Sequence, residues 1–195
     1  MTDYAEILYE IDGPVATITI NRPDTLNALT DLTQAEIRHA LDASERNSDI
    51  LGTVLTGAGR GFCSGVDMTA LGAMSEAGQR LGKTHEHLAA NPGNPDDDPN
   101  YKSSPSYFLG LRKPLIAALN GVCAGLGFSY ATFCDMRFMD SGARIVSSFS
   151  PRGLIAEHGT CWMLPRLVGP SNALDVFWSS RRIEAEEAYR IGWAN

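Results

Sequence analysis

The sequence has few of the features that mark membrane, disulfide-rich or metal-binding proteins. No apolar run approaches the roughly eighteen residues of a transmembrane helix. The N-terminus carries no signal-peptide pattern, and the four cysteines, at positions 63, 123, 134 and 161, show no CxxC spacing. These absences predict a cytoplasmic protein without a membrane partner and without disulfide bonds.

Basic residues are also scarce. The chain has 16 lysines and arginines against 23 aspartates and glutamates, which gives a net charge of −7. Nucleic-acid binding needs clustered positive charge, so this balance argues against a nucleic-acid partner. It also means that any phosphate on a ligand must be bound by local groups. With 195 residues, of which 44% are hydrophobic and 20% charged, the chain has the size and composition of one globular domain.

One glycine-rich stretch stands out, NGVCAGLGFSYATFCDMRF at residues 120–138. The apolar run at 114–119 (PLIAAL) predicts a buried strand before it, and residues 128–134 predict a helix within it. Three glycines lie between the strand and the helix. A strand, a glycine turn and a helix start together present free backbone N–H groups to a ligand. The same pattern also fits a tight connection with no ligand.

A second stretch repeats this arrangement. The apolar run at 50–56 (ILGTVLT) predicts a strand, and a glycine turn, GAGRGFCSGVD, follows at 57–67. Asp67 is placed where a helix begins, where a carboxylate is favourable. Two such turns in one domain predict two backbone donors that converge on one atom.

Elsewhere the local patterns predict ordinary elements. Asp12-Gly13 predicts a hairpin between strands at 5–10 and 15–20, and Thr30 predicts the cap of an amphipathic helix. The remaining predictions are strands at 135–140 and 144–149, helices at 154–164, 173–178 and 183–191, and a solvated loop at 91–100.

Five motifs, in order, resemble the enoyl-CoA hydratase/isomerase (crotonase) family. They are ITINRPDTLNAL (18–29), RGFCSGVD (60–67), RKPLIAALNG (112–121), the stretch at 120–138, and RGLIAEHGTCWMLPRLVG (152–169). The resemblance implies an α/β fold of repeated β-β-α units that form a spiral, with residues 1–195 as one domain. It also implies a homotrimer or a dimer of trimers. Members of the family usually continue with several more helices, so the C-terminal helical region is expected to be largely missing.

The resemblance also implies a site. The main-chain N–H groups of Val66 and Leu126 would bind the carbonyl oxygen of an acyl-CoA thioester. Coenzyme A, as part of that substrate, would contact Thr25, Leu26, Ala28, Ser64, Gly65, Asp67 and Gly125. No metal and no further cofactor is expected. Two backbone donors in a dry site would stabilise an enolate, each by on the order of 3 kcal/mol.

The reaction is predicted from which of the family's acidic residues this sequence has and which it does not. The two glutamates that hydratases of the family use to activate water correspond here to Ser129 and Gly153, which cannot act as general bases. Glu157 matches the single acid of the family's isomerases, which removes a proton and returns it two carbons away. It is expected to be buried against an apolar acyl pocket. His158 would either donate to the thioester or pack.

Three basic residues near the motifs, Arg22, Arg60 and Lys113, are candidates for the phosphates of coenzyme A. His85 and His87 flank an acid, but no third metal ligand is suggested, so a solvated surface is favoured over a metal site.

Three alternatives stay open. GVCAG, centred on Cys123, has the spacing of a nucleophile elbow, and Asp135 or Asp140 and then His158 follow in the order of an α/β-hydrolase. That protein would have a doubly wound parallel sheet. GFCSG, centred on Cys63, has the same spacing, and two elbows in one domain argue against this alternative. The others are an enoyl-CoA hydratase and a silent acyl-CoA-binding protein.

Overall fold

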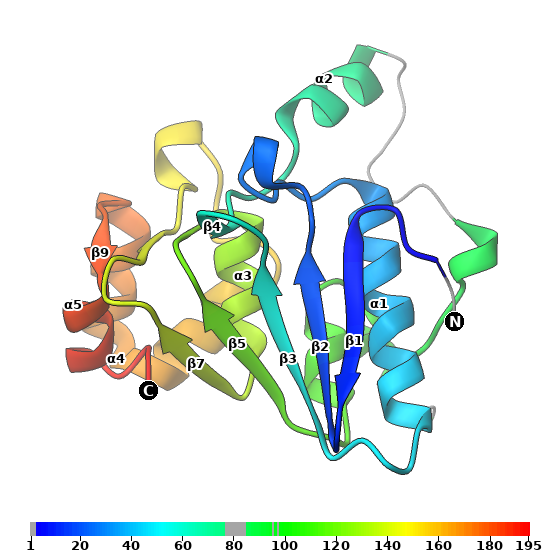
Figure 1. Cartoon of the computed structure of the whole chain (residues 1–195). Helices are drawn as coiled ribbons and strands as arrows, with labels where there is room; N and C mark the ends of the chain where they lie inside the picture. Colours follow the sequence, from blue (N-terminus) through cyan, green and yellow to red (C-terminus); the bar gives the residue numbers. More distant parts are fainter. Residues whose placement is uncertain (1–2, 77–84, 95, 97) are drawn as a thin grey trace.

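The computed structural model describes residues 3–76, 85–94, 96 and 98–195. A five-stranded sheet runs through the molecule in the order β1-β2-β3-β5-β7 (Figure 1). Its strands are β1 (Ile7–Asp12), β2 (Val15–Ile20), β3 (Gly52–Gly57), β5 (Leu115–Leu119) and β7 (Met136–Met139). Only β1 is antiparallel to its neighbour, and the other pairs are parallel. The carboxyl ends of β2, β3 and β5 therefore point to one edge of the sheet, from which helix α2 departs.

The predicted hairpin is confirmed. Asp12 pairs with Val15, and Gly13 in the two-residue turn has a φ of 55°, which glycine adopts without strain. The first strand begins at Ile7, two residues later than predicted.

A second sheet has four short strands, β4 (Gly61–Cys63), β6 (Val122–Ala124), β8 (Arg144–Val146) and β9 (Ile183–Glu184), in that order. Three successive strand pairs, β3/β4, β5/β6 and β7/β8, each place one strand in each sheet. The chain therefore winds as a spiral of β-β-α units, which confirms the fold expected from the motifs. The two glycine stretches were predicted as turns only, and each in fact contains a three-residue strand.

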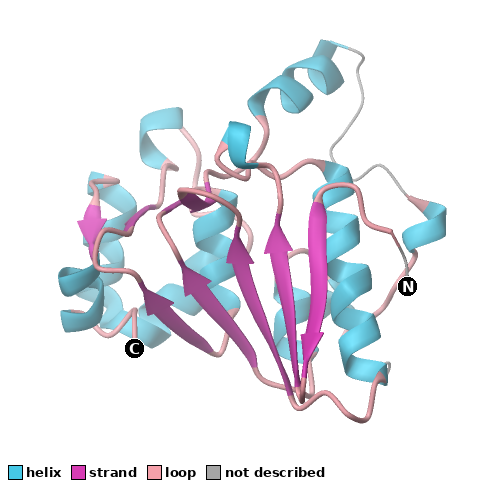
Figure 2. Ribbon diagram, in the orientation of Figure 1, coloured by secondary structure: helices cyan, strands magenta, loops and turns pink. Residues whose placement is uncertain are grey.

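The helices are α1 (Asp31–Arg46), α2 (Met68–Glu76), α3 (Leu126–Phe133), α4 (Thr160–Ser179) and α5 (Ala185–Arg190). Short 3₁₀ turns lie at η1 (Pro23–Thr25), η2 (Glu86–Leu88), η3 (Pro99–Lys102), η4 (Ser106–Gly110) and η5 (Ser150–Arg152). Helices α1 and α3 cover one face of the larger sheet (Figure 2). None of the helices in these ranges has both the length and the apolar character needed to span a bilayer.

Thr30 caps α1 as predicted. Its hydroxyl accepts the Thr33 N–H at 3.0 Å, and Thr33 reciprocates by accepting the Thr30 N–H. The predicted inner face, Ile37, Ala40, Leu41 and Ser44, is buried.

Several predicted helices have different boundaries in the structure. The helix predicted at 128–134 is α3, which begins two residues earlier, and the helix predicted at 173–178 is part of α4. Residues 154–159 are not helical, and α4 begins only at Thr160, because His158 and Gly159 have φ values of 56° and 73°. Ile183 belongs to β9, where it pairs with Ile145, so the predicted helix at 183–191 is reduced to α5. The predicted strands at 135–140 and 144–149 are β7 and the shorter β8. In the predicted loop at 91–100, positions 95 and 97 lie outside the described residues.

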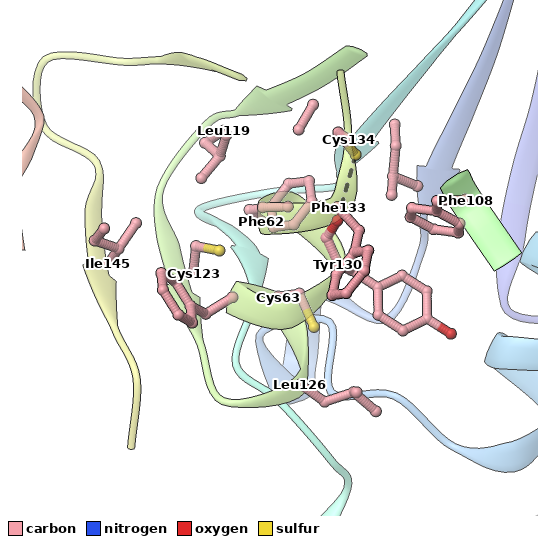
Figure 3. Close-up of a cluster of buried hydrophobic side chains, with 14 of the residues drawn as sticks. Phe62, Cys63, Phe108, Leu119, Cys123, Leu126, Tyr130, Phe133, Cys134 and Ile145 are labelled. Atoms are coloured by element: carbon pink, nitrogen blue, oxygen red, sulfur yellow. Dashed lines mark hydrogen bonds between the residues drawn. The ribbon is translucent and has the colours of Figure 1, made fainter. Parts of the chain in front are cut away.

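The core surrounds α3, all eight residues of which are buried. Figure 3 shows aromatic and sulfur-containing side chains, among them Phe62 and Cys123, packed around this helix, which itself contributes Phe133, with Leu126 at the edge of the cluster. Trp193 is fully buried and stacks on Phe128 at a centroid distance of 5.5 Å. The core therefore fixes the first turn of α3, which carries Leu126.

Candidate active site

The two glycine turns meet because the strands that precede them are paired. β4 and β6 are parallel neighbours, so both turns emerge from the same end of the smaller sheet. Gly65 has a φ of 110°, and a Cβ atom added to it would lie 3.2 Å from the Ala124 carbonyl oxygen and 3.5 Å from the Leu126 nitrogen. Glycine at position 65 thus allows the two turns to touch.

Among the described residues, no acceptor binds the N–H groups of Val66 and Leu126. Around Val66, Leu29 N–H donates to the Gly65 carbonyl at 2.7 Å, and Asp67 N–H donates to the Leu29 carbonyl at 2.9 Å. Val66 N–H itself has no acceptor among the described residues. Leu126 is the first residue of α3, so its N–H has no partner within the helix. Both residues line one cavity of about 580 Å³.

That cavity is lined by residues from five segments of the chain. Six of the seven positions expected to contact coenzyme A line it, namely Thr25, Ala28, Ser64, Gly65, Asp67 and Gly125. Leu26 does not line the cavity and packs against Gly61, where an added Cβ would lie 3.5 Å from the Leu26 Cδ2 atom. Glu157 and His158 are on the wall. Ser148, Phe149, Arg152 and Leu154 line it as well, and sequence reasoning missed these four.

Asn27 holds the loop at residues 25–28 against β4, and it too was missed. Its buried side chain donates to the carbonyls of Ala58 and Gly61 at 2.9 and 2.7 Å and accepts the Arg22 N–H at 2.9 Å. Asn27 has a φ of 58°, a conformation that asparagine adopts more readily than most residues. The side chain of Ser64 adds a bond to the Thr25 carbonyl at 3.0 Å.

Asp67 caps α2 and binds Arg22. Its carboxylate accepts the N–H groups of Thr69 and Ala70 at 3.0 and 3.1 Å and lies 2.9 Å from the Arg22 guanidinium. Burial by itself would raise the pKa of Asp67, but these hydrogen bonds and the Arg22 charge outweigh it and lower the pKa. Arg22 also pairs with Glu6 at 3.2 Å.

The three cations predicted to meet the phosphates do not line the cavity. Arg22 is engaged by two carboxylates, and the Lys113 ammonium donates to the carbonyls of Ser44 and Asn47 at the end of α1. Arg60 is exposed elsewhere. Among the cavity-lining residues that the structure describes, Arg152 is the one arginine or lysine.

Glu157 and His158 form a pair on the wall. The Glu157 Oε2 and His158 Nε2 atoms are 3.6 Å apart. The Glu157 side chain is 40% exposed, so its predicted burial is wrong in this chain. The Glu157 carbonyl accepts both the N–H and the hydroxyl of Thr160, at 3.0 and 2.6 Å, which fixes the pair at the start of α4.

Carboxylates are few at this cavity. Among its described lining residues they are Asp67 and Glu157. Ser129 is fully buried, with its hydroxyl donating to the Gly125 carbonyl at 3.3 Å. Gly153 does not line the cavity, and Phe149 and Arg152 form the wall on that side.

A second cavity, of about 380 Å³, adjoins the first. Val66, Leu126 and His158 line both cavities. The second is completed by Asp31, Gln34, Ala35 and Arg38 of α1 and by His85, Leu88, Ala89, Ala90, Ser104 and Tyr107. Nothing in the local sequence pattern indicates this cavity, because it depends on how residues 85–107 pack against α1.

The cysteine alternative is wrong. Cys63 and Cys123 are fully buried and line neither cavity. Burial raises the pKa of the Cys63 thiol to about 12 and that of Cys123 well above its usual range. A nucleophilic cysteine needs an accessible thiolate, which these positions do not provide. In the described ranges no group of three or more histidine, cysteine or acidic side chains is arranged to hold a metal ion.

Comparisons with known proteins agree with one another. A sequence model described as enoyl-CoA hydratase/isomerase matches residues 10–195. A curated protein named probable enoyl-CoA hydratase EchA14, from Mycobacterium tuberculosis, is 34% identical across 100% of this chain and 70% of its own length. The 1,2-epoxyphenylacetyl-CoA isomerase of Escherichia coli is 32% identical across 95% of this chain and 67% of its own length. The crystal structure of enoyl-CoA hydratase EchA8_6 from Mycobacterium marinum has a TM-score of 0.80 at 30% identity, covering 97% of this chain and 82% of that one.

Proposed function

Because the chain belongs to the enoyl-CoA hydratase/isomerase family, we propose that it moves a carbon–carbon double bond of an enoyl-CoA from the β,γ to the α,β position. The relatives named above include both a hydratase and an isomerase, so family membership does not choose between the two reactions. The choice rests on the acidic groups of the site.

The free N–H groups of Val66 and Leu126 form the oxyanion hole in this proposal. Removal of a proton from the α-carbon of a thioester places negative charge on the carbonyl oxygen. Two preorganised backbone donors stabilise that charge without having to reorient, which is usually a large contribution to catalysis. Their contact with one cavity and the close approach of Gly65 to the Leu126 nitrogen support this assignment.

Glu157 is the base, and the observation that carries the proposal is that no uncommitted second acid accompanies it among the described residues of the larger cavity. Asp31 lines only the smaller cavity. Of the two carboxylates at the larger cavity, Asp67 is committed to Arg22 and to the N–H groups of α2. Glu157 is the carboxylate left to accept a proton. A hydratase needs two acidic groups to position and activate water, whereas proton abstraction and return can begin from one. The site therefore favours isomerisation over hydration.

Coenzyme A would lie along Thr25, Ala28 and Ser64, with Arg152 as the cation nearest its phosphates. The reaction needs no metal and no redox cofactor, because the electrons displaced from the α-carbon return to the same carbon skeleton.

Replacement of Glu157 by glutamine tests the base. Glutamine preserves size and hydrogen bonding but cannot accept the proton, so Glu157→Gln should abolish exchange of the α-hydrogens of trans-3-hexenoyl-CoA in deuterated water. General acid–base catalysis of this kind contributes about 10²–10⁴-fold in rate. Exchange is measured by mass spectrometry of the recovered thioester. Glu184→Gln, at an exposed position outside both cavities, is the matched control and should exchange at the wild-type rate.

Two results would overturn the proposal. Unchanged exchange in Glu157→Gln would remove Glu157 as the base. Hydration of crotonyl-CoA by the wild-type protein as fast as isomerisation would favour the hydratase alternative.

A further inference from the structure

His158 borders both cavities, whereas Glu157 borders only the larger one. Val66 and Leu126 also line both. The pair of free N–H groups and the His158 side chain therefore lie where the two cavities join. The two proton-transfer groups of the site are adjacent in sequence but differ in which cavity they reach.

This inference rests on the proposed function, which implies that the substrate spans the junction of the two cavities. With the thioester oxygen between Val66 and Leu126, coenzyme A lies on the side of Thr25 and Ala28, in the larger cavity. The acyl chain then enters the smaller cavity. The α-carbon is next to the thioester, and the γ-carbon is two bonds farther along, toward the smaller cavity. Of the pair, His158 is the residue that borders this cavity.

We propose that the isomerisation uses two groups, with Glu157 removing the α-proton and His158 delivering a proton to the γ-carbon. The Oε2 and Nε2 atoms of the pair are 3.6 Å apart, which is within ion-pair distance. For this step Glu157 acts as a carboxylate and His158 as an imidazolium. The pair would supply the base and the acid of the reaction from one wall, with His158 at the junction of the two cavities.

The protons and electrons balance over one turnover. The α C–H bond breaks, its proton passes to Glu157, and its electron pair forms a dienolate whose negative oxygen is held by the two N–H groups. An imidazolium N–H bond of His158 breaks, a C–H bond forms at the γ-carbon, and the dienolate collapses to the α,β-unsaturated thioester. The proton on Glu157 then passes to the neutral imidazole, which restores the carboxylate and the imidazolium.

The backbone explains how two consecutive residues reach one cavity wall. Successive side chains in a strand point to opposite faces, and in a helix they are about 100° apart. His158 has a φ of 56°, a left-handed conformation that is uncommon outside glycine, although histidine adopts it more readily than most residues. This turn, followed by Gly159 with a φ of 73°, puts both side chains on the cavity wall.

The test compares α-exchange with isomerisation in one variant. In His158→Gln the base is intact, so loss of α-deuterium from [2,2-²H₂]-trans-3-hexenoyl-CoA into water should continue at the wild-type rate. Formation of 2-hexenoyl-CoA, followed by its ultraviolet absorbance, should slow by about 10²-fold or more. Glu157→Gln should lose both activities. His87→Gln, at an exposed histidine outside both cavities, is the matched control and should lose neither.

His158→Asn serves as a second variant, because asparagine adopts the left-handed backbone more readily than glutamine. Isomerisation at the wild-type rate in both variants would overturn the proposal. So would equal loss of exchange and isomerisation in both, since that pattern marks a structural role. A wild-type protein that neither exchanges nor isomerises would instead overturn the proposed function, so the two failures are distinguishable.

Discussion

Substitution of Gly65 by alanine tests whether the close contact between the two glycine turns matters for the catalytic rate. A second glycine substitution accounts for the loss of stability that backbone strain alone would cause. The φ of Gly65 is 110°, a conformation that costs a residue with a Cβ roughly 1–3 kcal/mol. The new Cβ would also lie 3.2 Å from the Ala124 carbonyl oxygen and 3.5 Å from the Leu126 nitrogen. One of the turns must therefore shift by a few tenths of an ångström, which moves the Leu126 N–H relative to that of Val66.

Gly13→Ala provides the matched control. Gly13 also has a positive φ, 55°, but an added Cβ meets nothing within 4 Å, and the hairpin turn is remote from both cavities. Left-handed backbone costs alanine about 1–2 kcal/mol. The control should therefore lose stability by about this amount and keep its catalytic rate.

The expected result for Gly65→Ala is a loss of rate that stability does not explain. Removing one oxyanion-hole donor lowers kcat by about 10²–10³-fold, and a misaligned donor should lose part of this factor. The Michaelis constant should change far less, because the donors act most strongly on the charged transition state. Guanidinium denaturation gives the stabilities, and steady-state isomerisation of trans-3-hexenoyl-CoA gives kcat and KM. A kcat within threefold of wild type in Gly65→Ala would refute the reasoning.

Two further predictions concern ionisable groups. The pKa of Asp67 is lowered from its ordinary value of 3.8, so the stability that its charge contributes is present above that value and is lost as pH falls through the folded-state pKa. Asp67→Asn should therefore lower the free energy of unfolding by roughly 1–2 kcal/mol at pH 7. In acid, urea denaturation should give the same free energy of unfolding for the variant and the wild type. An undiminished difference in acid would contradict the charge argument. Iodoacetamide at neutral pH should attach one group to the native protein, at the exposed Cys161, because Cys63, Cys123 and Cys134 are buried. Rapid modification of Cys123 would reopen the hydrolase alternative.

The spiral fold was expected from the resemblance of five ordered motifs to the family, and the meeting of the two turns from their repeated glycine pattern. The capped helix at Thr30 and the hairpin at Asp12-Gly13 were predictable for a local reason, since their side chains and turn residues determine the backbone nearby. Strands β4 and β6 were not, because three residues are too few to show a period of two.

The wall of the site was less predictable. The start of α4 depends on the left-handed backbone at His158, and a histidine in the sequence does not indicate this conformation. Asn27 matters through bonds to carbonyls more than thirty residues away, at Ala58 and Gly61. The smaller cavity depends on packing between α1 and residues near Tyr107, which are distant in the chain. Each of these features is set by tertiary contacts, on which local patterns carry no information.

The pairing of β4 with β6 has an evolutionary consequence. It fixes the N–H groups proposed for the oxyanion hole by contacts between short strands, and the excursion from α2 to β5 is a separate connection in the chain. In the described part of that excursion, three 3₁₀ turns and no strand occur, and several of its residues line the smaller cavity. Lengthening such a loop carries a penalty that grows only with the logarithm of its length. The excursion can therefore diverge in size and composition while the pairing of β4 with β6 stays constant.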